Sequence, residues 1–319
     1  MTEQNERPDQ DRDQDPDRGI VRENRADSAR FLAAIELTEV EASVFDRAFE
    51  VIPQYVPWPK AYGGDSVAQA AAAAIATVGD DRELHALHSS FLRPVEIGAP
   101  VRYEVELLRD GRGYSTRHVR GYQNDKVVFL TTASFQVPEP GPVFAPAMPE
   151  VPDPESLPSS EAYLAGRGAD GSAAGDYWAR GRSFDMRHVP GPLYLEVEGE
   201  RAPHQAVWIR AFDELPAEPR TQQIALSYLC DYTILEPSLR ALGLAWGSPG
   251  LVTASLDHSM WFHAPARADE WLLYAQESAG VQSGRGLSIG RFFSAAGELV
   301  ATVAQEGMIR SPQGAPGRP

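Results

Sequence analysis

The sequence lacks the features that would send a protein across a membrane or bind it to nucleic acid. Cys230 is the only cysteine in 319 residues, which excludes an internal disulfide framework and fits a reducing compartment. No apolar run approaches the roughly eighteen residues of a membrane span, and the N-terminus has no apolar core of a secretory signal. Basic residues are scarce, with 29 Lys and Arg against 45 Asp and Glu, and the formal net charge is -16. We therefore predict a cytoplasmic protein with no membrane span and no nucleic-acid partner.

The composition, 43% hydrophobic and 23% charged, is that of a soluble globular protein, but it is uneven along the chain. Fifteen of the first thirty residues are charged, so residues 1–30 are predicted to be a disordered tail. Eight prolines in "PEPGPVFAPAMPEVPDPESLP" disfavour regular structure and predict an extended linker. The predicted organisation is then two ordered units, 31–137 and 175–311, a Pro-rich linker at 138–174, and a second disordered tail at 312–319.

Two short phrases occur twice in the chain. "HSSFLRP" at 88–94 is echoed by "HSMWFHAP" at 258–265, and Gly-Arg-Gly at 111–113 is repeated at 284–286. Each Gly-Arg-Gly leads into an alternating run, a polar turn (QNDK or SAAGE) and a second alternating run, which is typical of a β-hairpin. Matching phrases in matching order predict that one supersecondary unit has been duplicated.

A helix is predicted ahead of the strands in each copy. Residues 62–78, "YGGDSVAQAAAAAIATV", place Asp65 where it would cap or charge a helix N-terminus. Residues 221–243, "TQQIALSYLCDYTILEPSLRALG", are also helical in length and composition. Both segments are apolar on nearly every side, so each helix should be buried. The predicted fold is α+β: two antiparallel sheets, each wrapped around a central helix, joined as a pseudo-dimer with a continuous sheet.

The chain resembles the acyl-CoA thioesterase II family, whose members are double hotdog thioesterases. In the first half the resemblance lies in "HSSFLRP", "VELLRDGRGYSTR" and "TTASFQVPE". In the second half it lies in "QAVWIRA", "LSYLCDYTIL", "SLDHSMWFHAP", "WLLYAQES", "GRG" and "VAQEGMIR". It covers about residues 31–310. It implies a double hotdog fold that hydrolyses fatty acyl-CoA to free fatty acid and CoA, with an acyl-CoA substrate, no cofactor and no metal.

Asp231 is the first candidate for chemistry. Between Arg220 and Glu236 it is the only charged residue, within a segment predicted to be a buried helix. A lone buried carboxylate is costly unless it is paired or kept for function, and a solvent-facing or paired aspartate is the structural alternative. The family resemblance implies that Asp231 is catalytic and polarises the attacking water.

Gln305 belongs to the alternating segment "ELVATVAQEGMIR". Strand periodicity places it on the same face as Leu299, Ala301 and Val303, towards the buried helix. Its amide could hold a water molecule, or it could be a buried glutamine satisfied by the backbone. The resemblance assigns a catalytic role to this Gln.

Ser255 matches the third catalytic position of the family, which carries Thr or Ser. Strand alternation puts Ser255 in step with Thr253, Asp257 and Ser259 and out of step with Leu256. A β-bulge or a polar pocket would be needed to bring its hydroxyl to the site. There it would hydrogen-bond Asp231 or the water, and would not act as a nucleophile.

Other polar residues favour structural roles. His258 and His263 are five apart on a strand, so they point to opposite faces and are not expected to share a metal. His88 and His258 are interpreted as hydrogen-bonding residues, and Cys230 as a small buried side chain.

Two glycines ahead of the first helix are the remaining candidates. Asp65 follows Gly63 and Gly64 directly, which favours helix capping over catalysis. The two glycines are predicted to bind substrate by letting a thioester carbonyl approach backbone N–H groups. Five arginines in the first half, at positions 93, 109, 112, 117 and 120, are interspersed with acids, so none is assigned to the CoA phosphates.

The sequence thus predicts a cytoplasmic hydrolase of fatty acyl-CoA that uses activated water and assembles as a homo-oligomer. The alternative is a non-catalytic acyl-CoA binding or sensing protein on the same scaffold.

Overall fold

The structure, a computed structural model, describes residues 27–167 and 172–311. The predicted tail at 312–319 lies outside the described residues, as does nearly all of the tail at 1–30. Helix α1, Ala29–Ile35, already begins within the last two residues of that predicted tail.

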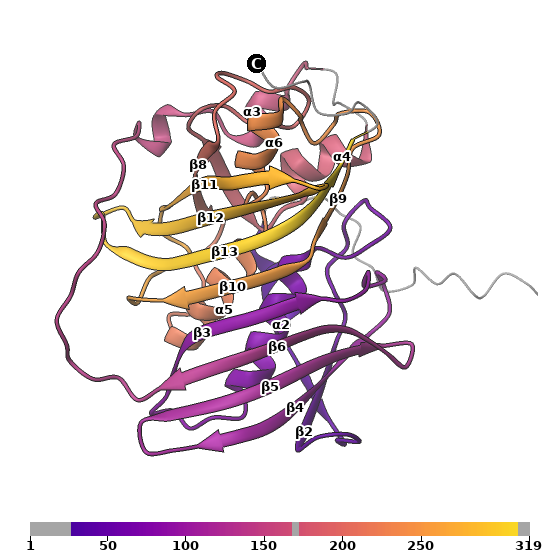
Figure 1. The fold of residues 1–319 in the computed structure, drawn as a ribbon, viewed down its shortest axis with the longest axis vertical. Helices are drawn as coiled ribbons and strands as arrows, with labels where there is room; N and C mark the ends of the chain where they lie inside the picture. Colours follow the sequence, from indigo (N-terminus) through magenta and orange to yellow (C-terminus); the bar gives the residue numbers. More distant parts are fainter. Residues whose placement is uncertain (1–26, 168–171, 312–319) are drawn as a thin grey trace, which may run out of the picture.

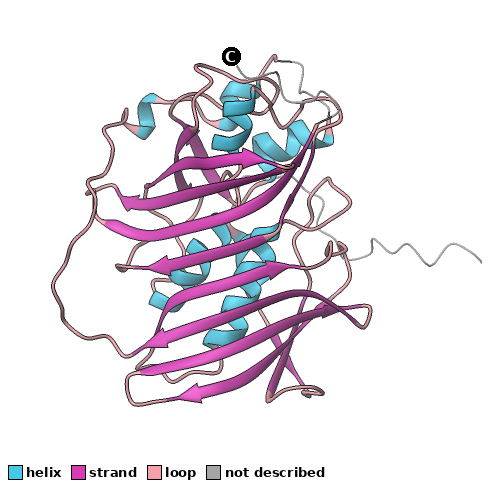
Figure 2. Ribbon diagram, viewed as in Figure 1, coloured by secondary structure: helices cyan, strands magenta, loops and turns pink. Residues whose placement is uncertain are grey.

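Thirteen strands within the described part of the chain form one antiparallel sheet (Figures 1 and 2). Along the sheet, the first half contributes β1 Thr38–Val40, β2 Arg47–Val51, β4 Val101–Asp110, β5 Tyr114–Gln123, β6 Lys126–Gln136 and β3 Glu83–Phe91. The second half follows with β10 Asp257–Phe262, β13 Leu299–Arg310, β12 Arg285–Ser294, β11 Leu272–Gln282, β8 His204–Ala211 and β7 Phe184–His188. A short strand, β9 Val252–Ser255, pairs with the far end of β13.

The strand order is the same when it is read inwards from either edge. The first half runs β2-β4-β5-β6-β3 and the second runs β8-β11-β12-β13-β10, so each half is one copy of the same arrangement. The copies meet at β3 and β10, where His88 lies opposite Ser259 and Ser89 lies opposite His258. The two repeated phrases are therefore the strands that join the halves into one continuous sheet.

Two helices lie side by side behind the middle of the sheet (Figure 1): α2, Gly63–Ile75, and α5, Pro219–Leu229. They run in opposite directions, because the start of α2 meets the end of α5 and the start of α5 meets the end of α2. A β-carbon on Gly64 would lie 2.4 Å from the carbonyl oxygen of Tyr228, and Arg220 Nη2 donates to the carbonyl of Val78 over 3.3 Å. The Ala-rich sequence of α2 permits this close packing, and the helix is buried from Gly64 onwards, as predicted.

The prediction of a single helix over residues 221–243 is wrong, and the difference changes the position of a candidate site residue. The segment 221–243 is two helices, α5 and α6, Glu236–Leu242, separated by a turn. Pro237 stands in the first turn of α6, where its missing N–H costs no hydrogen bond and its fixed φ favours a helix start. The single helix was predicted from apolar composition, which does not distinguish one helix from two.

The Pro-rich connection follows its prediction in part. Residues 137–153 contain no helix or strand and run along one side of the sheet, from the end of β6 to the second half (Figure 1). The rest of the predicted linker is more regular than expected. It contains a 3₁₀ turn, η1 Pro154–Ser156, and the short helices α3 Ser160–Leu164 and α4 Ala173–Asp176, the last followed by a π-helical turn, η2 Tyr177–Gly181.

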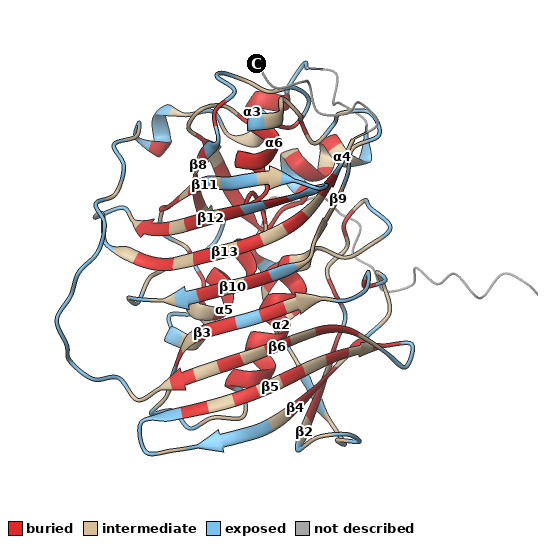
Figure 3. Cartoon of the chain, in the orientation of Figure 1, coloured by how far each residue is buried: buried red, intermediate tan, exposed pale blue. Residues whose placement is uncertain are grey.

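Burial alternates along the strands (Figure 3). In β13 Ala301, Val303 and Gln305 are fully buried, so this part of the predicted inward face is confirmed. Leu299 differs from the prediction: a register shift beside it buries Val300 instead, and Leu299 packs against the separate cluster of Trp208, Leu273 and Phe293.

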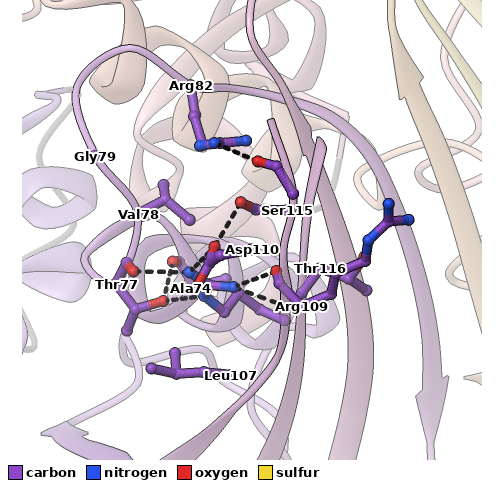
Figure 4. A network of polar contacts seen from close by, with 12 residues as sticks. Ala74, Thr77, Val78, Gly79, Arg82, Leu107, Arg109, Asp110, Ser115 and Thr116 are labelled. Atoms are coloured by element: carbon purple, nitrogen blue, oxygen red, sulfur yellow. Dashed lines mark hydrogen bonds and ion pairs between the residues drawn. The ribbon is translucent and has the colours of Figure 1, made fainter. Parts of the chain in front are cut away.

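A buried arginine closes the end of α2 that is far from Gly64. Arg117 is 2% exposed and donates to Thr77 Oγ1 over 2.9 Å, to the carbonyl of Arg109 over 3.0 Å and to Asp110 Oδ1 over 2.8 Å. Ser115 Oγ donates to the same Asp110 oxygen, as Figure 4 shows. This network fixes the β4–β5 hairpin to the helix.

Candidate active site

Asp231 lies two residues beyond the end of α5, in the turn before α6, and is not inside a helix as the sequence had indicated. Its neighbours anchor the turn. The carbonyl of Cys230 accepts a hydrogen bond from Tyr274 Oη at 2.8 Å. The ring of Tyr232 stacks on Tyr62 with centroids 4.8 Å apart. Both neighbours are buried, whereas Asp231 itself is only partly buried. The turn therefore presents one carboxylate from a rigid support.

The three polar residues singled out in the sequence come together in space. Asp231 Oδ1 accepts hydrogen bonds from Ser255 Oγ at 2.9 Å and from Gln305 Nε2 at 2.5 Å. Gln305 Nε2 also lies 3.1 Å from Ser255 Oγ. These residues come from the α5–α6 turn, β9 and β13, which are far apart in the sequence. Two donors thus converge on one oxygen of the carboxylate, which leaves Oδ2 for another partner.

A bulge brings Ser255 into this cluster. Ser255 pairs with Gly307 and Ser259 pairs with Ala304, so four steps on one side match three on β13. The extra residue reverses the alternation between β9 and β10, and Ser255 therefore shares the inner face with the buried His258. The sequence had indicated that either a bulge or a polar pocket would be required, and the pairing shows that it is a bulge.

His258 orients the amide of Gln305. Its Nδ1 lies 3.0 Å from Gln305 Oε1, and the imidazole is fully buried. Since Gln305 Nε2 donates to a carboxylate, its Oε1 faces His258 and can only accept, so Nδ1 carries the proton. Burial lowers the pKa of His258 to about 4, which keeps the ring neutral. The hydrogen-bonding role predicted for His258 is confirmed, with Gln305 as its partner.

The ionisation of Asp231 is a balance of opposing effects. Burial raises the pKa of Asp231, because a charged carboxylate loses solvation. Hydrogen bonds from Gln305 and Ser255, the positive charge of Lys60 and the backbone N–H of Gly64 lower it again. The pKa stays above the ordinary value. A carboxylate with a raised pKa is a better proton acceptor than an exposed one.

The start of α2 faces the same carboxylate. A β-carbon on Gly63 would lie 2.4 Å from Asp231 Oδ2 and 3.1 Å from Phe91 Cε1, so only glycine leaves this space open. A helix N-terminus carries partial positive charge from its unpaired N–H groups. The glycines therefore border the free oxygen of Asp231 and bring backbone donors to it.

Comparisons with known proteins identify the family of the chain. The family model described as acyl-CoA thioesterase matches residues 180–308, and the model of the acyl-CoA thioesterase N-terminal domain matches residues 54–136. "Acyl-CoA thioesterase 2" of Haemophilus influenzae is 34% identical over 280 residues, which cover 86% of this chain and 96% of that protein. "Acyl-coenzyme A thioesterase 8" of Homo sapiens is 36% identical over 264 residues, 80% of this chain and 82% of that one. The chain belongs to the acyl-CoA thioesterase family.

Solved structures support the fold. An acyl-CoA thioesterase II from Mycobacterium marinum superposes with a TM-score of 0.71 at 34% identity, covering 90% of this chain and 99% of that one. A protein described as having a hot dog fold, from Alicyclobacillus acidocaldarius, superposes with a TM-score of 0.69 over 88% of this chain and 98% of that one. At 22% identity the second comparison bears on the fold alone. The double hotdog architecture expected of this acyl-CoA thioesterase is confirmed.

Asp65 does not cap α2 of the thioesterase as predicted. It lies in the first turn and is 1% exposed, but its Oδ2 accepts from the backbone N–H of Gln54 at 2.8 Å and its Oδ1 from Gln54 Nε2 at 3.3 Å. Burial raises its pKa to about 7. The carboxyl therefore accepts hydrogen bonds from the loop that leads into α2 and not from the first N–H groups of the helix.

The remaining polar candidates of the thioesterase have structural partners. His88 Nδ1 contacts Ser259 Oγ at 3.0 Å on the exposed face, and His263 Nε2 contacts Thr302 Oγ1 at 2.9 Å. Cys230 is fully buried. Within residues 27–167 and 172–311, no three His, Cys, Asp or Glu side chains form a group that could hold a metal, and no helix is long and apolar enough to cross a membrane.

The five arginines of the first half do not converge on the site. Arg117 is held in the network at the end of α2, and Arg93 donates to the carbonyl of Val127. Two surface cavities, of about 420 and 200 Å³, lie in the second half and are lined by residues from Ser159 to Glu270 that include none of the site residues. The candidate site is therefore recognised by its hydrogen-bonded side chains and not by either cavity.

Sequence reasoning missed Lys60, which acts electrostatically on Asp231 from the loop before α2. It is one of only two lysines in the chain, but nothing in its local sequence indicates a contact with the second half.

Proposed function

We propose that the protein hydrolyses fatty acyl-CoA to a free fatty acid and CoA with a water molecule activated by Asp231. The observation that carries this proposal is the convergence of Ser255 and Gln305 on one oxygen of a partly buried carboxylate. Such a carboxylate is fixed in orientation and retains one oxygen for a water molecule.

The reaction needs few groups. Water hydrogen-bonded to Asp231 gives up a proton to the carboxylate as its oxygen attacks the thioester carbonyl carbon. N–H groups in the first turn of α2, beside Gly63 and Gly64, stabilise the oxyanion. The carbon–sulfur bond then breaks, and the thiolate takes the proton back from Asp231. A free thiol has a pKa of about 8.5, so this leaving group needs little help from an acid.

Ser255 and Gln305 serve as holding groups in this scheme. Both side chains donate hydrogen bonds to Oδ1 of Asp231. The water molecule therefore binds Oδ2, the oxygen beside Gly63. Ser255 donates its proton to the carboxylate, so its oxygen is not activated as a nucleophile. The acyl chain lies along the buried helix of one half.

We also propose that the protein works in the cytoplasm as a homo-oligomer and that residues 31–137 and 175–311 are its two folding units. The duplicated strand order supports the two units. Self-assembly is proposed by analogy with other hotdog proteins, whose sheets usually pair further.

The test is thiol release from acyl-CoA substrates of short, medium and long chain by the wild type and by Asp231→Ala. We expect release by the wild type and at least a hundredfold slower release by the variant. Equal rates would remove Asp231 from the mechanism. Binding of acyl-CoA without release at any chain length would favour the non-catalytic binder.

A further inference from the structure

Lys60 lies in the loop between β2 and α2, three residues before Gly63. The chain has only two lysines, and the other, Lys126, is exposed at the start of β6. Lys60 is half-buried, so its ammonium group has lost part of its solvation. A half-buried ammonium group needs hydrogen-bond or charged partners that replace the lost water.

The ammonium group joins the two halves of the molecule at the active site. Lys60 Nζ donates to the carbonyl oxygen of Thr253 at 2.7 Å, across 193 positions of sequence. Thr253 is in β9, two residues before Ser255 on the same strand. The contact therefore fixes the strand that carries Ser255 to the loop that leads into α2.

The next two residues hold the same loop to other elements. Ala61 N–H donates to the carbonyl of Val95 at 2.8 Å, and Tyr62 Oη donates to the carbonyl of Tyr228, near the end of α5, at 2.8 Å. The loop is thus attached at consecutive residues to β9, to the segment after β3 and to α5. These attachments set the position of the α2 N-terminus against Asp231.

Lys60 also supplies charge. Its ammonium lowers the pKa of Asp231. Burial lowers the pKa of Lys60 itself, and the negative charge of Asp231 opposes this lowering only in part. The other groups that act on Asp231 are neutral at neutral pH. They are the donors Gln305, Ser255 and the Gly64 N–H, the buried Tyr62, Cys230 and Tyr274, and His258 behind Gln305. Lys60 is therefore the positive charge that acts on Asp231 among these described groups.

We propose that Lys60 is a positioning residue of the hydrolytic site, whose ammonium holds the Ser255 strand in place and supplies a positive charge at the site. This inference rests on the proposed function. It assigns Lys60 no contact with the reacting atoms, because its hydrogen bond goes to the backbone of β9.

The consequence is a defined pH dependence. Asp231 must be ionised to accept a proton, so activity rises with pH through its pKa. Removal of the Lys60 charge takes away one of the effects that lower the pKa of Asp231. Burial, which raises this pKa, is then opposed less strongly, so the pKa rises further. An opposite charge at short range changes a carboxyl pKa by about 1 unit or more. The acid limb of the rate profile should therefore move to higher pH.

The experiment compares kcat/KM for acyl-CoA hydrolysis against pH in Lys60→Gln, Lys60→Arg and the matched control Lys126→Gln. Glutamine removes the charge and keeps an N–H donor, whereas arginine keeps the charge. We expect Lys60→Gln to shift the acid limb upward by about one pH unit, with about tenfold loss below the limb and a smaller loss above it. Lys60→Arg and Lys126→Gln should keep the wild-type limb. An unshifted limb in Lys60→Gln, including an equal loss at every pH, would overturn the proposal.

A second measurement does not depend on turnover. Carboxyl NMR titration, with the Asp231 signal assigned through Asp231→Asn, gives the pKa of Asp231 directly in the wild type and in Lys60→Gln. A higher value in the variant supports the proposal, and equal values overturn it. Absence of thiol release by the wild type would count against the proposed hydrolysis and would leave this comparison to decide the role of Lys60.

Discussion

The surroundings of the Asp231 carboxylate include groups that disfavour its negative charge and groups that stabilise it. It follows the C-terminal end of α5, where the helix carbonyls disfavour a negative charge, and it is partly removed from water. The N-terminus of α2, the donors from Ser255 and Gln305, and the charge of Lys60 counter this cost. The result is an anion with a raised pKa, which is suited to accept a proton from water.

His258 affects the reaction through Gln305, and a substitution can separate this role from folding. His258→Leu fills the buried space but removes the donor to Gln305 Oε1, so the amide is free to rotate. We expect kcat to fall by about ten- to a hundredfold with little change in KM, because a lost buried hydrogen bond costs roughly 1–3 kcal/mol. Steady-state kinetics measure it, with the exposed His263→Leu as control. Equal kcat for the two variants would contradict this role.

Asp65 predicts a pH dependence of stability. Its pKa is about 7 in the folded protein and near 3.8 in the unfolded chain, so the folded state holds a proton that the unfolded state releases between these values. Stability therefore falls as pH rises through this window, by about 1.4 kcal/mol per pH unit from this group. Asp65→Asn should remove this part of the slope. Urea denaturation at pH 5 and pH 8 measures it, and an unchanged slope in the variant would exclude Asp65 as the cause.

Secondary-structure elements bring together side chains that the sequence keeps apart. The β9–β10 bulge turns Ser255 inward, the α5–α6 turn exposes Asp231, and the strand periodicity of β13 directs Gln305 towards both. The bulge, the turn and the strand periodicity each depend on a few neighbouring residues. The three side chains meet only because α2 and α5 pack against the same sheet.

Local patterns predicted part of this arrangement. The period of two placed Gln305 on the inner face, and the alternation around Ser255 showed that a bulge or a polar pocket was needed. The break between α5 and α6 was missed, because apolar residues on every side hide the helix boundary that Pro237 marks. Lys60 acts through a contact between the two halves, and His258 reaches Gln305 across the β10–β13 pair, so no local pattern encodes either contact.

A substitution at Gly63 tests how closely the start of α2 approaches Asp231, which follows the end of α5. Alanine suits a helix start, so Gly63→Ala should leave the backbone unstrained, but its β-carbon would meet Asp231 Oδ2 at 2.4 Å. We expect at least a hundredfold loss of kcat/KM, since displacement of the carboxylate by about 1 Å is enough for such a loss, with little change in melting temperature. Gly113→Ala is the control, because a β-carbon there meets nothing within 4 Å. Wild-type activity in Gly63→Ala would show that Oδ2 is not used.

At the scale of the whole molecule, duplication creates two equivalent ends between the antiparallel helices. Asp231 lies two residues beyond α5, and the position two residues beyond α2 is Thr77. Thr77 accepts hydrogen bonds from the Arg117 guanidinium at both Oγ1 and its carbonyl oxygen. Where the first end has Gly63 and Gly64, this end has Pro219 and Arg220 at the start of α5. Of these two positions, only the one that follows α5 carries a carboxylate.

One hydrolytic site per chain is therefore expected. Titration with a non-hydrolysable acyl-CoA thioether in a calorimeter should give one molecule bound per chain, and Asp231→Asn should leave this number unchanged because it preserves shape. A stoichiometry of two would mean that the Thr77 end also accepts substrate.

The role of Asp231 as the base that activates water is the claim on which the rest depends. Its most direct test is the single-turnover rate of thiol release from a bound long-chain acyl-CoA, compared between the wild type and Asp231→Asn. We predict that the variant binds the substrate as tightly and releases thiol at least a hundredfold more slowly. Release at the wild-type rate from Asp231→Asn would contradict the mechanism.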